Sequence, residues 1–513
     1  MFIVLNYQFS PAFKASSVAS LSYESASRDT YVPSNVLDGN IYAASITSKR
    51  QLITINTSVN YIHRFSEALK LDMTIGNELR TIDDKLTSVD GSKALESGGS
   101  DYVKIVTGYN ASQTNALSDH EMEKLVSFYG TWKWNYKSDL DVNMVLRADG
   151  SSLYENKWAL YPALGIHYNL NNIANIPVKA SIAYGKTGVL SGAEAYRGEL
   201  DAYGDYFGRN ELGIGLLYPA FREAKSVEVY RFDAGLEIRI LPVLDLCLNY
   251  FDKTYKDFTY QRFLPNISGT DYQYETGSSL GLSGIEAEVR GKWFNTSGFR
   301  WTTDFNIAAY QNKVKSLPDD RQSTSVSFLT ALNKGDALSS LVAYEAGIAK
   351  VIGNGEAKAF GGISNSFGFK DVTLSFTANY TWGADVLAES FSSTYYADLV
   401  GNKFPLKNAE TPYYLSANDL SGRTVYQGIR TIEDASFISL SRASLSYNIG
   451  PALKQIIAIR DMHLFLRGDN LLTITNYSGV NPEENITAIR KRNLSLTGTP
   501  LPSSIVLGLK LML

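Results

Sequence analysis

Apolar and polar residues alternate along most of this chain with a period of two. The clearest runs cover residues 140–147, 230–240, 372–382 and 504–513, and similar runs recur at 52–61, 69–80, 178–186, 244–256, 285–293, 301–310 and 443–449. Successive side chains of a strand point to opposite faces, so each run predicts a strand with one apolar and one polar face. No segment of helical period accompanies them, and the pattern predicts an all-β fold.

A soluble β-sandwich also alternates, but its strands are usually about 5–6 residues long. Many runs here exceed ten residues, which matches the roughly 9–11 that a tilted strand needs to cross a bilayer. Aromatic residues stand at the ends of the runs, as in the interfacial girdles of membrane barrels. They are Tyr61, Trp132, Trp134, Tyr184, Tyr230, Tyr250, Trp293, Trp301, Tyr380, Trp382 and Tyr447.

The connections between the runs fall into two alternating classes. Short ones lie at 10–12, 63–67, 135–138, 170–176, 241–243, 294–299, 368–371 and 450–460, and mostly long polar ones near 26–50, 81–121, 188–225, 257–278, 313–358, 384–433 and 473–502. Short periplasmic turns opposite long outer loops are typical of up-and-down barrels. The sequence therefore predicts a transmembrane antiparallel β-barrel.

The runs add up to about 17 strands, whereas bacterial single-chain barrels have an even number. We therefore expect further strands upstream of Met1. Without them, residues 2–10 would have to pair in parallel with residues 503–513. Residues 1–7 also lack the basic region and the cleavage site of a secretory signal. These features lead us to expect a gene fragment, a truncated chain or one half of a split receptor, unable to transport by itself.

The amino-acid composition further narrows the class of protein. Charged residues make up 19%, and the net charge is −4 with no basic block, so nothing in the composition indicates nucleic-acid binding. No run approaches the roughly 20 apolar residues of a membrane-spanning helix. The single cysteine, Cys247, has no partner for an internal disulfide.

Catalytic or metal-binding patterns are missing from the sequence. The four histidines, His63, His120, His167 and His463, have no metal-ligand spacing, and no G-x-S-x-G motif occurs. We therefore expect no enzyme, no catalytic or metal site and no cofactor. The segment 149–152 is read as the end of a strand. The acidic pairs Asp319-Asp320 and Glu483-Glu484 could bind calcium in their loops. The simpler interpretation is that they are solvated loop charges.

Many charged residues occupy the polar positions of the alternation. They are Asp139, Asp141, Arg147, Arg231, Asp233, Glu237, Arg239, Glu286, Glu288, Arg290, Arg442 and Arg467. An arginine or lysine facing lipid at the midplane costs about 2–4 kcal/mol, so these residues are predicted to line the lumen, together with His463. Which residues contact a substrate stays unknown. Loop tyrosines could stack on sugar rings or pack in their loops: Tyr196, Tyr203, Tyr206, Tyr395, Tyr396, Tyr413 and Tyr414.

Several short motifs, in this order, resemble those of SusC/RagA-type TonB-linked outer-membrane proteins. Arg147-Ala148-Asp149-Gly150-Ser151-Ser152, followed by Lys157-Trp158-Ala159-Leu160-Tyr161-Pro162-Ala163, resembles the R-x-DGSS and W-x-x-FPS stretches. Later segments with the same resemblance are 179–188, 283–289, 360–367, 435–440, 445–448, 469–472 and 477–483. The resemblance covers residues 140–513 best and is looser before residue 140. The chain ends in Leu513, where the family commonly has Phe.

The resemblance implies a barrel of about 22 strands with an N-terminal plug, of which residues 1–513 supply the C-terminal portion, about 17 strands without the plug. It further implies a Gram-negative outer-membrane importer of glycan or peptide fragments. Implied partners are outer-membrane lipids, a SusD-like surface lipoprotein, and TonB, which would act through the part not present in this sequence. The alternative that remains open is a passive porin, or a structural barrel fragment without energy coupling. A soluble adhesin sandwich or an outer-membrane enzyme fits the sequence less well.

Overall fold

The computed structural model describes residues 1–32, 42–92, 114–137, 139–153, 158–170, 176–189, 199–203, 213–218, 226–264, 270, 272–321, 323–325, 331–345, 348–388, 413–418, 424–449, 461–477, 481–483, 494–495 and 501–512. Two compact units divide the chain: Met1–Ile166 with Tyr184–Tyr230 and Asp257–Thr276, and His167–Ala183 with Arg231–Lys256 and Gly277–Leu513. A search of the described residues for a helix able to span a membrane finds none.

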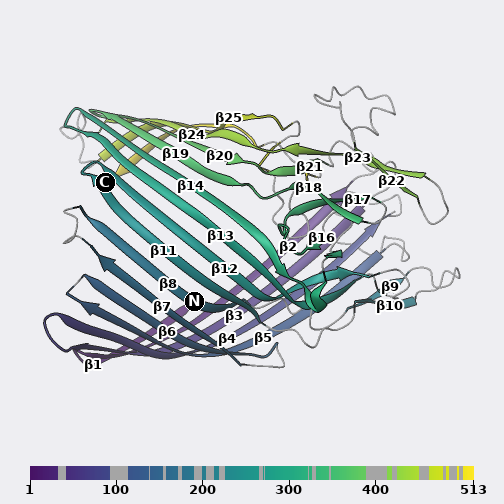
Figure 1. The fold of residues 1–513 in the computed structure, drawn as a ribbon, viewed down its shortest axis with the longest axis horizontal. Coiled ribbons are helices and arrows are strands. Elements are labelled where there is room, and N and C mark those ends of the chain that lie inside the picture. The colour runs from purple at the N-terminus through teal and green to yellow at the C-terminus, as the bar shows by residue number, and fades with distance from the viewer. Residues whose placement is uncertain are drawn as a thin grey trace. The chain divides into compact units, whose positions relative to one another are not determined.

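Seventeen strands form one large sheet, as the alternation predicts (Figure 1). They are β1 (Phe2–Ser10), β2 (Phe13–Val32), β3 (Tyr42–Arg64), β4 (Leu69–Ser92), β5 (Thr114–Tyr136), β6 (Leu140–Ser151), β7 (Trp158–Asn169), β8 (Val178–Val189), β11 (Val227–Leu241), β12 (Leu244–Phe263), β13 (Tyr272–Asn295), β14 (Phe299–Ser316), β19 (Ala359–Phe369), β20 (Val372–Trp382), β24 (Phe437–Asn448), β25 (Asp461–Thr475) and β27 (Ser504–Met512).

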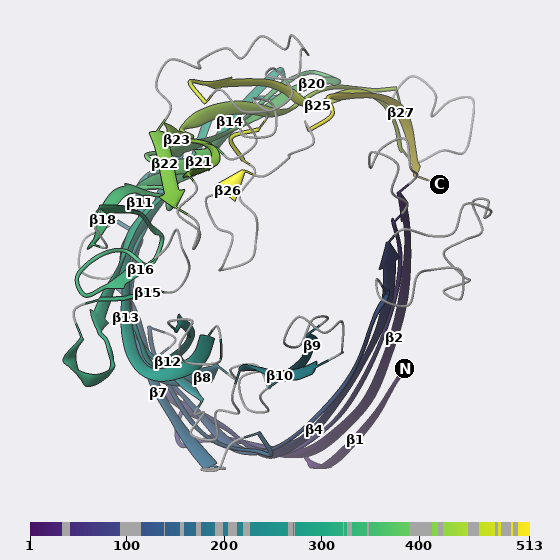
Figure 2. The same cartoon turned by 90° about the vertical axis from the view of Figure 1, so that its right-hand side faces the viewer.

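Short elements lie in the long connections between these strands. They are β9 (Glu199–Tyr203), β10 (Gly213–Tyr218), β15 (Ser323–Ser325), β16 (Ala331–Asn333), β17 (Ser340–Glu345), β18 (Ile348–Asn354), β21 (Asp385–Ala388), β22 (Tyr413–Asn418), β23 (Thr424–Asp434), β26 (Leu494–Ser495) and a 3-10 turn, η5 (Pro318–Asp320). Most pair as small hairpins. In the first unit, Figure 2 shows the β9–β10 hairpin standing off the concave side of the layer formed by β1 to β4.

Neighbouring strands of the large sheet pair antiparallel wherever their register is resolved. β19 and β20 pair from Ala359 with Trp382 to Phe369 with Val372, so only residues 370 and 371 connect them. β2 and β3 pair in the same way over twenty residues from Phe13 with Tyr61 to Val32 with Tyr42. The predicted short turns at 10–12, 63–67, 241–243, 294–299 and 368–371 are confirmed, because the strands on both sides of each end where the alternation stops. The turn predicted at 450–460 and most of the one at 170–176 lie outside the described residues.

The predicted long loops of the first unit are partly wrong. β2 to β5 continue as paired strands into segments 26–50 and 81–121, which the alternation assigned to loops. Both faces of these extensions carry polar residues, so the period-two signal disappears although the backbone ladder persists. Asp83 illustrates this: its Oδ1 lies 2.6 Å from Nε2 of His120, and this hydrogen bond holds the pKa of Asp83 below its usual range.

The sheet has a polar face and an apolar face. Across β13 and β14, Glu286, Glu288 and Arg290 stand opposite Ala308, Asn306 and Asp304, respectively. Across β25 and β27, His463 stands opposite Lys510, while the exposed Leu507 lies opposite Leu466. The predicted grouping of His463, Arg467 and Asp469 on one face is therefore confirmed by the register.

Aromatic side chains form continuous rows on the apolar face at the short-turn end of the strands. In the first unit, rings follow one another through Tyr7, Phe9, Phe13, Tyr61, His63, Phe65 and Trp134, at centroid distances of 4.5–6.4 Å. In the second unit, Phe294, Trp301, Phe367 and Phe376 stack in sequence. The predicted placement of aromatics at strand ends is confirmed for these rows, which have the form of an interfacial girdle.

Buried apolar residues collect at the opposite ends of the strands, beneath the long connections. In the first unit, Tyr161, Val227 and Val229 are buried. In the second unit, Val386, Ala435 and Tyr477 form a small cluster.

Candidate functional site

Charged residues on the polar face pair with partners two positions away on the same strand. Arg231 Nε lies 2.6 Å from Asp233 Oδ2, and Arg290 Nη2 lies 2.7 Å from Glu288 Oε1. Residues at i and i+2 share one face of a strand, so the pairs keep both signs of charge on that face. The prediction that these residues lie together on the polar face is confirmed.

Arg147 is the centre of the most extensive of these groups, in the first unit. Its Nε donates to Asp149 Oδ1 at 2.6 Å, and its Nη2 donates to Ser127 Oγ at 2.8 Å. Nη2 also lies 3.7 Å from Glu78 Oε1, and the guanidinium stands 6.0 Å from the ring centroid of Tyr129. Arg147 thereby joins strands β4, β5 and β6, which explains why the R-x-DGSS stretch begins with arginine.

The rest of that stretch ends strand β6. Ser152 exchanges two hydrogen bonds with Lys124: its backbone N donates to the Lys124 carbonyl, and its Oγ accepts from the Lys124 backbone N, both at 2.9 Å. Ser151 Oγ accepts from the backbone N of Leu153 at 3.2 Å. The interpretation of residues 149–152 as a strand end is confirmed.

We predict that Arg147→Ala lowers the free energy of unfolding by about 1–3 kcal/mol, because the carboxylates of Glu78 and Asp149, which are only 19% and 21% exposed, lose their charged donor. Denaturant unfolding of the membrane-inserted protein measures this. Arg239→Ala is the matched control, since Arg239 pairs with Asp245 at 2.7 Å but is 55% exposed, and exposed pairs contribute little to stability. Equal losses in the two variants would contradict the role given to Arg147.

A cavity of about 720 Å³ opens on the second unit where β14, β19, β20 and β24 lie side by side. It sits toward the long-connection end of these strands. Its polar-face lining comprises Asn306 and Tyr310 from β14, Phe360 and Gly362 from β19, Asn379 and Thr381 from β20, and Phe437 from β24. Glu356 and Glu483 line it from the connecting segments.

The register places two amide side chains beside a glycine inside this cavity. Gly362 stands between Asn306 on β14 and Asn379 on β20 in one row across the strands. Asn306 Oδ1 accepts from the backbone N of Gly362 at 3.1 Å. A Cβ at Gly362 would come within 3.1 Å of Asn379 Oδ1, so the missing side chain leaves both amides accessible from the cavity.

Aromatic rings and carboxylates complete the cavity. The next row contains Phe360, Thr381 and Phe437, and the Phe360 ring meets the Tyr310 ring edge-on at 5.9 Å. Glu483 Oε1 accepts from Ser439 Oγ at 3.2 Å, and Glu356 accepts from Asn312 Nδ2. The lining side chains that the structure describes include no lysine or arginine. The two carboxylates, Glu356 and Glu483, and the two amides suit a neutral or cationic ligand with hydroxyl or amide groups.

The sequence prediction did not identify this cavity: Glu483 was considered only as part of an acidic loop pair, and Tyr380 only as an aromatic residue at a strand end. Asn306 and Asn379 occupy polar positions of the alternation, but they carry no charge and so drew no attention. The loop tyrosines that were considered for stacking, Tyr196, Tyr206, Tyr395 and Tyr396, lie outside the described residues, as do the side chains of Tyr203, Tyr413 and Tyr414.

The histidines are dispersed. His63 belongs to the aromatic row, with its Nδ1 3.2 Å from the Tyr61 hydroxyl, and His120 pairs with Asp83. His463 stands on the polar face opposite Lys510, and His167 lies on β7. Across the part of the chain that the structure describes, no group of three or more histidine, cysteine or acidic side chains could hold a metal ion. Of the acidic pairs, Glu484 is not described, and Asp319 lies 3.5 Å from Arg321.

The comparisons with known proteins agree on one family. A family model described as TonB dependent receptor-like, beta-barrel, matches residues 2–471. TonB-dependent receptor P3 of Formosa agariphila is 23% identical, over 93% of this chain and 54% of its own length. TonB-dependent receptor P39 of the same organism is 22% identical, over 75% of this chain and 46% of its own length. The chain thus spans about half the length of these curated relatives.

Solved structures show the same fold. The RagAB peptide transporter superposes with a TM-score of 0.77 at 15% identity, covering 99% of this chain and 61% of that chain. The copper transporter OprC superposes with a TM-score of 0.52 at 13% identity, covering 92% of this chain and 58% of that chain.

Proposed function

Because this chain belongs to the TonB dependent receptor-like β-barrel family, we propose that residues 1–513 form the C-terminal barrel portion of an outer-membrane importer of glycan or peptide fragments. The family is one of receptors and transporters of the outer membrane, not of enzymes. In such barrels the apolar face of the sheet contacts lipid and the polar face lines the interior. The paired charges and the amide-lined cavity then belong to the interior.

The cavity on the second unit is the observation that carries this proposal. Oligosaccharides and peptides present hydroxyl and amide groups, which Asn306 and Asn379 can bind as donors and acceptors. Phe437 and Phe360 add flat apolar surfaces beside the amides. An apolar wall with a few placed polar groups is typical of ligand sites. The similarity to a peptide transporter supports peptides as one of the two substrate classes.

The same proposal includes three partners. Energy would come from TonB through a plug-bearing segment outside residues 1–513, and a SusD-like surface lipoprotein would cover the long-connection side. Outer-membrane lipids would surround the apolar face. These partners are suggested by the family and by the resemblance of the motifs. The two protein partners can each be tested by deletion of their genes in the producing cell.

We predict that Asn379→Ala and Phe437→Ala each raise the substrate concentration for half-maximal uptake about 3- to 10-fold. Each removes roughly 1 kcal/mol of binding, the usual net contribution of one hydrogen bond or aromatic contact. Uptake of labelled oligosaccharide and peptide mixtures is measured in cells carrying the complete receptor. Thr373→Ala is the control, since Thr373 lies on the polar face of the same strand outside the cavity.

Energy dependence separates an importer from a passive pore. Uptake that stops when TonB is deleted supports the importer, whereas unchanged uptake supports a porin. Uptake equally affected by Thr373→Ala and Asn379→Ala would contradict the assignment of the cavity.

A further inference from the structure

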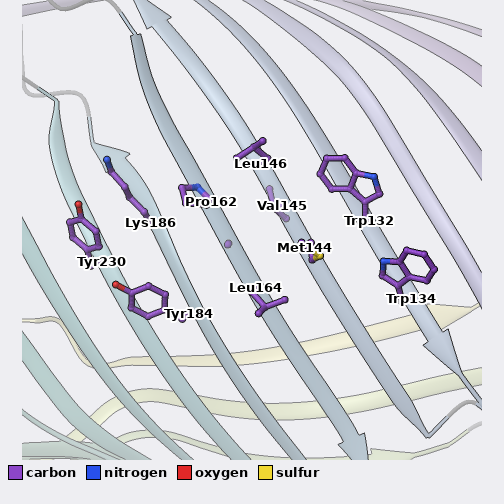
Figure 3. Close-up of a pocket in the computed structure, with 11 residues that line it drawn as sticks. Trp132, Trp134, Met144, Val145, Leu146, Pro162, Leu164, Tyr184, Lys186 and Tyr230 are labelled. Carbon is purple, nitrogen blue, oxygen red and sulfur yellow. The ribbon is translucent and has the colours of Figure 1, made fainter.

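The apolar face of the first unit carries a groove of about 580 Å³ across β5, β6, β7, β8 and β11 (Figure 3). Most of its lining is hydrocarbon or aromatic: Trp132, Trp134, Met144, Leu146, Leu164 and Tyr184. Figure 3 shows the two indoles at one end of the groove, with Lys186 and Tyr230 toward the other end. The groove lies on the face opposite the Arg147 group, so it is separate from the proposed substrate route.

Two features of the sequence create this groove. Gly130 has no side chain, and a Cβ there would lie 2.6 Å from the Trp132 ring, so the indole lies along the strand over the glycine. Leu146 stands opposite Gly130 on the next strand. Pro162 occupies the middle of β7, where its short ring leaves room between larger neighbours. Together these features leave a groove that is lined by hydrocarbon.

A single charged side chain lines the groove among the residues that the structure describes. Lys186 Nζ donates to Glu228 Oε1 at 2.5 Å and stands 5.8 Å from the ring centroid of Tyr230. Tyr230 donates its hydroxyl to Glu228 Oε2 at 2.9 Å, which fixes the carboxylate. An ammonium group has three donor hydrogens, so Lys186 can hold Glu228 and an additional anionic acceptor together.

We propose that this groove binds one phosphorylated membrane lipid, with an acyl chain along the indoles and Leu146, and the phosphate at Lys186. Hydrocarbon lines the groove along its length and complements an acyl chain. The single cation at its end complements the phosphate of such a lipid. A lysine on a lipid-facing surface keeps its ammonium where polar groups are available, and lipid phosphates supply them. Lys186 lies eight residues along β8 from Val178, toward the long-connection end, where the headgroups of the outer leaflet are expected.

The test is native mass spectrometry of the full chain in detergent, titrated with dipalmitoyl phosphatidic acid or with dipalmitoylglycerol, which lacks the phosphate. We expect one bound phosphatidic acid and at least about tenfold weaker binding of dipalmitoylglycerol. Met144→Trp fills the groove and leaves Lys186 and Glu228 intact, so it should weaken phosphatidic acid binding about tenfold. Leu374→Trp, on the apolar face of β20 in the second unit, is the matched control and should change nothing.

Lys186→Gln should remove the preference for phosphatidic acid over dipalmitoylglycerol. Wild-type binding in Met144→Trp would overturn the proposal, as would equal affinity of the native chain for the two lipids. The proposal would also be overturned if the native chain formed dimers that bind no lipid and if Met144→Trp separated these dimers. The groove would then be an interface between two copies of this chain.

Discussion

Gly361→Ala is expected to lower the free energy of unfolding by about 2–3 kcal/mol, a shift of roughly 30- to 160-fold in the folding equilibrium. A Cβ at Gly361 would overlap the backbone carbonyl oxygen of Asn306 and lie 2.7 Å from the hydroxyl of Tyr380. That hydroxyl donates to the same carbonyl at 2.9 Å, and the Tyr380 ring stacks on Phe305. The new methyl group would therefore push strands β14 and β19 apart beneath a packed ring.

Gly298→Ala is the control for this substitution, because a Cβ at Gly298 meets no atom within 4 Å. It should change stability by less than about 0.5 kcal/mol. Denaturant unfolding in lipid vesicles compares the two variants. The double variant Gly361→Ala, Tyr380→Ala should remain destabilised, since the nearest obstacle is backbone; full recovery would contradict this explanation.

Leu146→Arg should cost about 2–4 kcal/mol of stability in a bilayer, which corresponds to roughly 30- to 900-fold in the folding equilibrium. Leu146 lies midway along β6 on the apolar face, 43% exposed. In the membrane that exposed surface contacts hydrocarbon, which solvates a guanidinium poorly. Urea unfolding from vesicles measures the loss.

Val145→Arg is the matched control, one residue away on the same strand. Val145 is 38% exposed but faces the polar side with Arg147, where water and carboxylates accept a charge. Val145→Arg should lower the free energy of unfolding by less than about 1 kcal/mol. Equal costs for residues 145 and 146 would mean that β6 does not separate lipid from an aqueous interior.

The strands, their number and their two faces were predictable because one physical constraint acts on every residue of the spanning segments. Leu236 and Glu237, for example, had to face opposite ways, since only one side of such a strand can hold a charge. Arg147 could be placed on the polar face by the same argument. Its contacts with Ser127 and Glu78 could not be predicted, because they depend on the register between β4, β5 and β6.

The strand extensions and the cavity escaped prediction for a related reason. Beyond the bilayer both faces meet water, so residues such as Asp83, Asp84 and Lys85 carry no alternation although they are paired in β4. The cavity combines Asn306, Asn379 and Phe437, which are distant in the sequence and meet only through strand pairing. Polar, uncharged residues at interior positions near a long connection are the signal that could have located it.

Accessibility of nitroxide labels tests most directly whether the apolar face meets lipid and the polar face meets water. Labels are placed one at a time at Leu236, Glu237, Leu509 and Lys510 of the membrane-inserted protein, and their relaxation by oxygen and by a water-soluble nickel chelate is compared. We predict that labels at 236 and 509 respond mainly to oxygen, and that labels at 237 and 510 respond mainly to the nickel chelate. Equal responses within each neighbouring pair would contradict the barrel and the import route built on it.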